Sequence, residues 1–144
     1  MDIVELIKTA KIGRERKEAQ IDTCAPFAAA LYDVLLENGF SPSLVTVGYR
    51  AGGLRNTWYH SVVKCDDVMY DSLGEFSTEI IRARLRIHPS VMYELTFTPD
   101  YREGCYDEED YSVLYEFLVD ELRKSAKRLA PPAAKAQPAA TFCP

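Results

Sequence analysis

The sequence lacks the features that mark several large classes of protein. No apolar run approaches the roughly 20 residues that a membrane-spanning helix needs. Basic side chains number 17 against 22 acidic ones, and the net charge of −5 argues against binding to a nucleic-acid backbone. The N-terminus has an acid, Asp2, where a signal peptide needs positive charge. We therefore expect a cytoplasmic protein without membrane or nucleic-acid partners, and export by a route that reads no signal peptide stays open.

Patterns typical of metal or cofactor sites are also missing. The four cysteines at 24, 65, 105 and 143 are 41, 40 and 38 residues apart, so no CxxC pair occurs. Only two histidines are present, and neither belongs to an HxxEH-type pattern. The glycine pair Gly52-Gly53 is too little for a phosphate-binding loop. The sequence therefore predicts no metal site and no cofactor.

The residues that are present suffice for one folded domain. The chain has 144 residues, of which 47% are hydrophobic and 27% charged, and this composition suits a single core. Residues 130–144 are rich in Ala and Pro and carry one charge, which is typical of a flexible tail. We expect one domain over residues 1–129, followed by this tail.

Hydrophobic periodicity predicts helices first and then a sheet. One helix is expected over about 2–18. A second begins after a cap at Asp22 or Thr23, has Pro26 in its first turn and ends at Gly39. The later elements are expected as strands at 44–49, 58–65 and 68–71, a short helix at 76–86, a strand at 91–98 and a helix at 108–128. Helices followed by an antiparallel sheet with one inserted helix indicate the α+β class.

Cys24 is the cysteine whose local structure favours reactivity. It lies in the first turn of the second helix, where unpaired N–H groups and the positive end of the helix dipole favour thiolate over thiol. A lone cysteine on a helix is more often a small core residue, so this interpretation depends on a nearby base. Cys65 is expected in the core, and Cys105 and Cys143 have no base nearby in the sequence.

His60 has an acidic partner within reach. Asp66-Asp67 is typical of a tight turn, so residues whose numbers sum to 133 should pair across a hairpin. Asp71 then stands opposite Val62, on the face that His60 shares. At this diagonal spacing the carboxylate can accept one ring N–H of His60 and leave the other nitrogen for Cys24.

His88 lacks such a partner. Asp100 follows it along the chain, but an expected strand rather than a turn lies between them. At about 3.3 Å per residue this strand holds the two side chains roughly 40 Å apart. We expect a surface or capping role for His88.

The order of Cys at a helix start, His on a strand and Asp on the next strand resembles the transglutaminase-like branch of the papain-like cysteine hydrolases. The resemblance spans residues 22–73. It rests on Cys24-Ala-Pro-Phe27-Ala28, Leu35-Leu36-Glu-Asn-Gly39-Phe40, Val45-Thr-Val-Gly48, His60-Ser-Val-Val63 and Val68-Met-Tyr-Asp71. It implies a papain-like fold with N-terminal helices packed on an antiparallel sheet. It also implies that Cys24 is the nucleophile, His60 the general base and acid, and Asp71 the orienting carboxylate.

Further residues are expected around this triad. The backbone N–H of Cys24 is the expected oxyanion donor because it points out of the helix start. Gln20 resembles in type the glutamine that papain-like enzymes place before their cysteine. Trp58 and Tyr59 are expected to wall the cleft beside His60, although such aromatic residues more often serve as hydrophobic cover.

These features predict a thiol-dependent enzyme that acts on an amide or thioester group of a protein or peptide through a covalent acyl-enzyme. Peptide hydrolysis, glutamine deamidation and transglutaminase-type transfer share this machinery and stay open. One alternative is a catalytically silent domain of the same fold that binds a partner protein, since Asp22-Thr23 and Ser72 depart from the family's usual residues. Another is an acyltransferase that uses coenzyme A donors, although no basic, glycine-rich phosphate cradle is present.

Overall fold

The computed structural model describes residues 1–12, 24–51, 58–84, 93–102 and 108–130. Its elements in chain order are α1 (Ile3–Thr9), α3 (Cys24–Glu37), β1 (Ser43–Ala51), β2 (Trp58–Cys65), β3 (Val68–Asp71), β4 (Gly74–Phe76), α4 (Thr78–Arg84), β5 (Tyr93–Asp100) and α6 (Glu108–Leu129). The strands form one antiparallel sheet in the order β4-β3-β2-β1-β5. The expected α+β class is thus confirmed. Within the described residues, no helix has the length and apolar character that crossing a bilayer requires.

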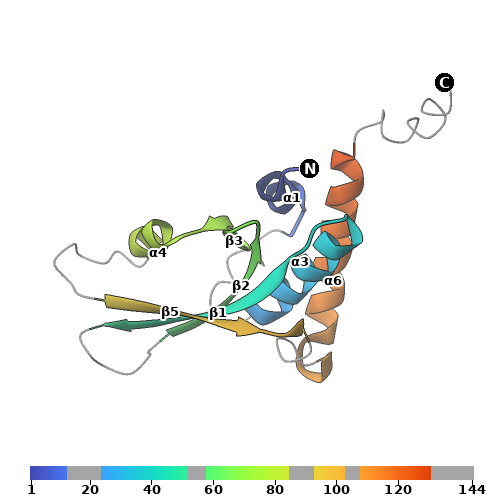
Figure 1. Cartoon of the computed structure of the whole chain (residues 1–144). Helices are drawn as coiled ribbons and strands as arrows, with labels where there is room; N and C mark the ends of the chain where they lie inside the picture. The colour runs from blue at the N-terminus through green and yellow to red at the C-terminus, as the bar shows by residue number, and fades with distance from the viewer. Residues whose placement is uncertain (13–23, 52–57, 85–92, 103–107, 131–144) are drawn as a thin grey trace.

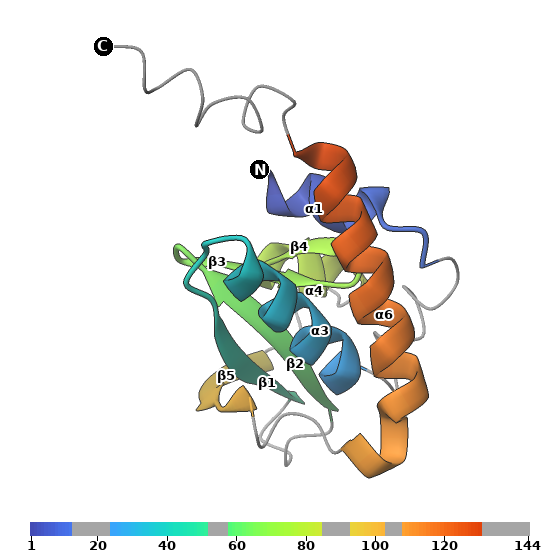
Figure 2. The same ribbon diagram turned by 90° about the vertical axis from the view of Figure 1, so that its right-hand side faces the viewer.

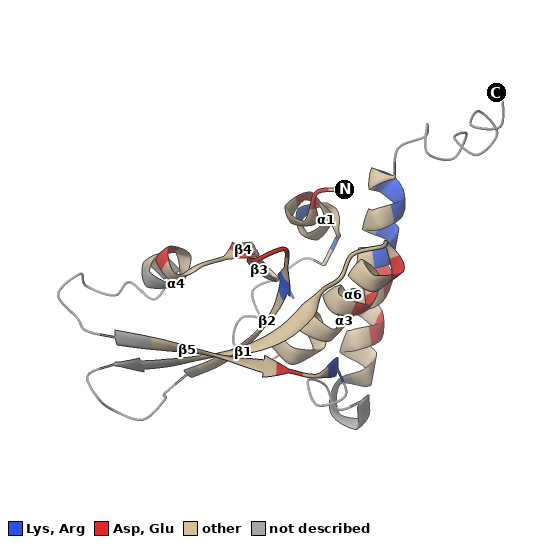
Figure 3. Ribbon diagram, viewed as in Figure 1, with Lys and Arg blue, Asp and Glu red and all other residues tan. Residues whose placement is uncertain are grey.

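The helix α3 packs against the sheet, mainly on β2, and α6 lies beside α3 and also contacts α1 (Figures 1 and 2). The sheet is strongly curled, so that β3 and β4 bend away from β1 and β5 and leave a concave side opposite the helices (Figure 1). Lys and Arg side chains gather at the C-terminal end of α6, where they complement the helix dipole (Figure 3). The two sides of the sheet therefore differ, since the helices cover one and the other is concave.

The helix α3 runs as the sequence predicts. Its end at Gly39 has a φ of +86°, a conformation that glycine adopts without steric cost. There the Phe40 N–H donates to the Leu35 carbonyl at 3.0 Å and the Gly39 N–H to the Leu36 carbonyl at 3.2 Å, the bond pair of a Schellman cap. Apolar residues at helical spacing form its buried stripe: Phe27, Ala28, Leu31, Val34 and Leu35. The expected N-caps, Asp22 and Thr23, lie outside the described residues.

The β2–β3 hairpin has the predicted turn and register. Asp66 and Asp67 have φ values of 51° and 66°, both in the left-handed region that a type I′ turn requires. The cross-strand pairs sum to 133 as expected: Val63 with Tyr70, Lys64 with Met69 and Cys65 with Val68. This register puts Asp71 diagonal to His60 on one face of the sheet.

Alternation along the strands divides the core in two. The larger cluster lies between the helices and the sheet, and its strand residues are Leu44, Val63 and Cys65. The smaller cluster lies on the concave side and consists of Val45, Val47, Val62 and Phe76, with Met69 and Leu95 packed against it. By alternation, His60 belongs to the concave side with Val62.

Some boundaries differ from those expected. The first helix ends at Thr9 rather than near 18, because Ala10 has an extended backbone and the chain turns to bury Ile12. The segment expected as a helix from 76 starts with a strand, since Gly74–Phe76 pairs with β3 and only Thr78–Arg84 is helical. The strand expected at 91–98 is Tyr93–Asp100. The predicted tail lies outside the described residues from 131 onwards.

Candidate active site

Cys24, His60 and Asp71 come together in the structure. Cys24 is the first residue of α3, while His60 and Asp71 lie on β2 and β3. The His60 Nε2 atom is 3.1 Å from the Asp71 Oδ2 atom, and both side chains are 1% exposed. The backbone N–H of Ser61 donates to the Cys24 Sγ atom at 3.5 Å. The half-buried thiol thus lies at the strand that carries the imidazole.

The unequal lengths of the strand ladders explain how Cys24 reaches this strand. The β1–β2 ladder runs from Trp58 to Lys64, whereas the β2–β3 ladder covers Val63–Cys65. The N-terminal half of β2 therefore extends past the end of β3. The start of α3 lies beside this extension, and the Ser61 N–H there bonds to the sulfur. A helix on one side of the sheet can thus bring its first residue to an imidazole on the other side.

The two carboxylate oxygens of Asp71 have different partners. Oδ1 accepts the N–H of Leu73 at 3.0 Å, an Asx turn that fixes the carboxylate at the end of β3. Oδ2 faces His60 Nε2. Because an ionised carboxylate only accepts hydrogen bonds, Nε2 carries the proton of this bond. The carboxylate therefore sets the orientation of the ring and leaves Nδ1 for chemistry with the thiol.

Burial and charge act in opposite directions on the Cys24 thiol. Burial by itself raises its pKa, but hydrogen bonds from the His60 ring and from Ser61, together with the charge of His60, outweigh this effect. The net result is a lowered pKa for Cys24. The site therefore favours the thiolate, which is the reactive form of cysteine.

The imidazole responds in the complementary way. Burial alone lowers the pKa of His60, but hydrogen bonds to Asp71 and Cys24 and the negative charges of both partners raise it by more. The net pKa of His60 is therefore raised. A lowered thiol pKa beside a raised imidazole pKa shifts both groups toward a thiolate–imidazolium pair, in which the ring holds the proton that a leaving group needs.

Phe76 is a neighbour of the site that the sequence did not reveal. Its ring centroid is 5.5 Å from that of His60, with the two planes inclined at 47°. Phe76 lies on β4, within a segment expected to be helical, so no contact with His60 was predicted. Two signals point to β4: the short Ser72-Leu73 connection after Asp71, and the Gly74 that follows it with a φ of +117°.

Among the other expected residues, Tyr59 is the one whose side chain the structure describes. Tyr59 lies on β2 and is 62% exposed, and alternation puts it on the opposite face of the strand from His60. Trp58 is the first residue of β2, but its side chain lies outside the described part of the chain. Gln20 and His88 also lie outside it. Their expected positions stay predictions.

Cys65 provides a comparison within the same strand. It is 3% exposed and belongs to the larger core cluster, as its position opposite in parity to His60 predicts. Burial raises the pKa of its thiol, with a further contribution from the charge of Asp66. Cys65 is therefore a core residue whose environment disfavours the thiolate, the reverse of Cys24.

Among the residues that the structure describes, no group of three or more His, Cys, Asp or Glu side chains is arranged to hold a metal ion. Comparisons of the chain with protein-family models, curated proteins and solved structures found no match. The evidence on the function of the chain therefore comes from the chemistry of Cys24, His60 and Asp71.

Proposed function

We propose that the chain is a cysteine-dependent enzyme of the transglutaminase-like, papain-like type that acts on an amide or thioester group of a protein or peptide. The observation that supports this most is the buried His60–Asp71 pair, joined at 3.1 Å, beside a Cys24 thiol whose pKa is lowered. These are the nucleophile, the base and the orienting group that acyl transfer through a thioester needs.

A purely structural role accounts less well for the same residues. Burying an imidazole and a carboxylate costs desolvation energy, and apolar side chains of similar size often give equal or greater stability. Cys65 illustrates a structural cysteine in this protein, because it is buried and its thiol pKa is raised. Cys24 is only half-buried and its pKa is lowered. A thiolate kept accessible next to a buried pair is what catalysis requires.

The proposed reaction has two steps. In the first, Cys24 Sγ attacks the carbonyl carbon, and the His60 imidazolium gives its Nδ1 proton to the amine as the carbon–nitrogen bond breaks. The product is a thioester on Cys24. In the second, water or another amine attacks the thioester, His60 accepts the proton of the attacking group, and the thiolate leaves. Asp71 holds Nε2 throughout.

The start of α3 contributes to the same steps. The first N–H groups of a helix have no acceptor within the helix, and that of Cys24 lies at the nucleophile itself. We expect it to donate to the oxyanion that forms on the attacked carbonyl. Peptidase, deamidase and transglutaminase reactions differ only in the leaving group and in the acceptor, so all three are compatible with this arrangement.

The thiolate is tested by the rate of alkylation with iodoacetamide at mildly acidic pH, with the labelled cysteine identified by mass spectrometry. Cys24 should react first, because an ordinary thiol is protonated there. His60→Ala should remove the advantage of Cys24. If Cys24 reacts no faster than Cys143 in the same molecule, the proposed activation of the thiol is wrong.

The reaction class is tested with casein as substrate and three readouts: new peptide termini, released ammonia and incorporation of a fluorescent primary amine. These report hydrolysis, deamidation and amine transfer, respectively. Cys24→Ala should abolish whichever activity is found, and Cys65→Ala, a matched change in the core, should retain it. A biological activity that survives Cys24→Ala would instead indicate a silent domain that binds a partner.

A further inference from the structure

On the concave side, the Phe76 ring of β4 lies against the His60 ring of β2. Along β4 and β3, Phe76 pairs with Met69, so by strand register alone it lies two strands away from His60 and well along the sheet from it. Because the sheet bends, the two rings nevertheless meet at 5.5 Å. The contact is therefore a product of tertiary structure.

The surroundings of the His60–Asp71 hydrogen bond are dry. Both side chains are 1% exposed, and the Phe76 ring against the imidazole is 2% exposed. In such surroundings a hydrogen bond between charged groups is stronger than in water, because no water competes for the Nε2 proton and the local dielectric constant is low. A side chain that keeps water away thus strengthens the bond that orients the ring.

The geometry of the ring contact is also suited to the charged imidazole. A centroid distance of 5.5 Å with tilted planes falls in the range of favourable aromatic pairs. An aromatic face attracts a cation at this distance, so Phe76 favours the imidazolium that the proposed function needs. An aliphatic side chain would lack this attraction, and leucine, which is smaller than phenylalanine, would also cover less of the His60–Asp71 hydrogen bond.

We infer that Phe76 is a positioning residue of the site, which holds the His60 ring in its plane against Asp71 and favours its protonated form. The inference rests on the proposed function and deepens it. It makes the β3–β4 hairpin a functional unit: Asp71 at one end orients the imidazole through Nε2, and Phe76 at the other end covers the ring. The hairpin thereby controls the thiolate of Cys24 without touching a substrate.

The test compares Phe76→Leu with Val45→Ala. Leucine keeps the site apolar and removes the ring, whereas Val45 belongs to the same concave cluster and lies outside the catalytic residues. For each protein, three quantities are measured: the exchange of the His60 Nε2 proton with water by NMR, the pH dependence of Cys24 alkylation by iodoacetamide, and the urea midpoint.

Phe76→Leu should speed the proton exchange and lower the alkylation rate at mildly acidic pH by about threefold to tenfold, as loss of an aromatic pair predicts. The alkylation profile should shift to higher pH, because less imidazolium is present to stabilise the thiolate. Val45→Ala should lower the urea midpoint and leave both other quantities unchanged.

Two results are distinguishable. If Phe76→Leu lowers the urea midpoint as Val45→Ala does and changes neither proton exchange nor alkylation, then Phe76 is core filling and the inference is wrong. If Cys24 of the unmodified protein reacts no faster than Cys143, the proposed function fails, and the proton exchange still decides whether Phe76 protects the His60–Asp71 bond.

Discussion

Asp71 has two tasks that a single substitution separates. Asparagine keeps an oxygen for the Leu73 N–H, so the turn after β3 is retained. It replaces the acceptor that faces His60 Nε2 with an amide that has no negative charge. Because that carboxylate raises the pKa of His60, we predict that Asp71→Asn lowers it. The His60 ring protons can be followed by NMR during a pH titration, in a His88→Gln background that leaves one histidine.

Asp67→Asn is the control for this titration. It removes an exposed carboxylate at the hairpin turn, and asparagine tolerates the positive φ of this position. Its His60 midpoint should equal that of the parent. If the His60 titration midpoint of the Asp71→Asn protein also equals that of the parent, the Asp71 carboxylate does not raise the pKa of the imidazole. The proposed role of Asp71 would then have to be given up.

The three residues of the candidate site could be predicted from the sequence because each depends on a local signal. Pro26 and Gly39 mark the limits of the helix that starts near Cys24, and Asp66-Asp67 sets the register that relates His60 to Asp71. The contacts of Phe76 and of the Ser61 N–H could not be predicted in this way. They depend on the curl of the sheet and on where β3 ends, which no periodicity in the sequence encodes.

Among the elements, the β2–β3 hairpin is the one on which the site depends most directly. Both turn residues have positive φ, which a β-branched side chain adopts only with strain. We predict that Asp67→Val lowers the free energy of unfolding by about 1–2 kcal/mol. The matched control is Glu75→Val on β4, an exposed strand position where valine is favourable and stability should not fall. Urea unfolding of both variants gives the comparison, and equal stability would contradict the assigned turn.

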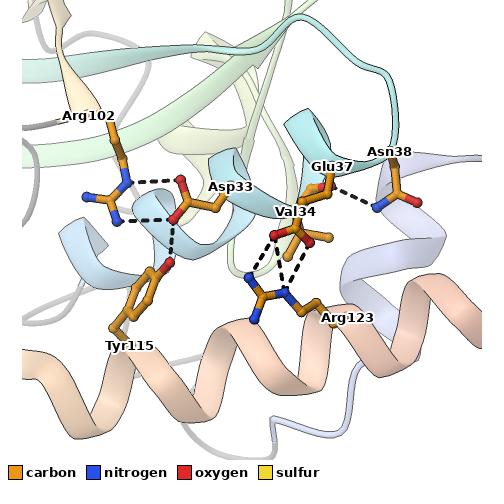
Figure 4. Close-up of polar contacts among 7 residues, drawn as sticks. All are labelled: Asp33, Val34, Glu37, Asn38, Arg102, Tyr115 and Arg123. Carbon is orange, nitrogen blue, oxygen red and sulfur yellow. Dashed lines mark hydrogen bonds and ion pairs between the residues drawn. The ribbon is translucent and has the colours of Figure 1, made fainter.

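A second element-level prediction concerns how α3 is attached to its neighbours. Arg102 donates from Nε and Nη2 to the two oxygens of Asp33 at 3.0 and 3.1 Å, and Tyr115 of α6 donates to the same carboxylate (Figure 4). Burial, followed by this hydrogen bond, raises the pKa of Tyr115 to about 12. Arg123 of α6 makes a similar forked contact with Glu37, but this pair is nearly half exposed.

The two contacts allow the same substitution to be compared in two environments. Arg102→Lys loses the forked geometry in a partly buried network, and we predict a loss of about 1.5–3 kcal/mol in the free energy of unfolding. Arg123→Lys at the exposed pair should cost less than about 1 kcal/mol. Urea unfolding measures both, and an equal loss at the two sites would contradict the view that Arg102 anchors α3.

The elements that were mispredicted have physical explanations. Gly74–Phe76 is a strand of only three residues, too short to show an alternating pattern, and its last residue, Phe76, falls within the helix expected at 76–86. The first helix was expected to be longer because Ile12 fits its apolar face. In the structure Ile12 is buried after the chain leaves the helix at Ala10, so tertiary packing rather than helical periodicity accounts for its burial.

At the scale of the whole molecule, the site links stability to pH. His60 has a raised pKa in the folded protein, so its contribution is fully present below the unfolded value of 6.5 and is lost as pH rises through the folded value. Cys24 has a lowered pKa, so its contribution is present above the unfolded value of 9.0 and is lost as pH falls through the folded value. Between pH 6.5 and pH 9.0, a rise in pH therefore decreases the contribution of His60 to the free energy of unfolding and increases that of Cys24.

The comparison of the parent with Asp71→Asn tests the contribution of the His60–Asp71 pair, and both proteins keep the Cys24 thiol. The imidazolium gains more from the Asp71 carboxylate than the neutral ring does. The parent should therefore exceed the variant in free energy of unfolding most at about pH 6, below the unfolded value of 6.5, and this advantage should decline as the pH rises and the ring loses its proton. Urea titrations at successive pH values give the difference directly. A difference that stays constant or grows with pH would mean that Asp71 does not raise the pKa of His60, and the proposed stabilisation of the imidazolium by this carboxylate would have to be given up.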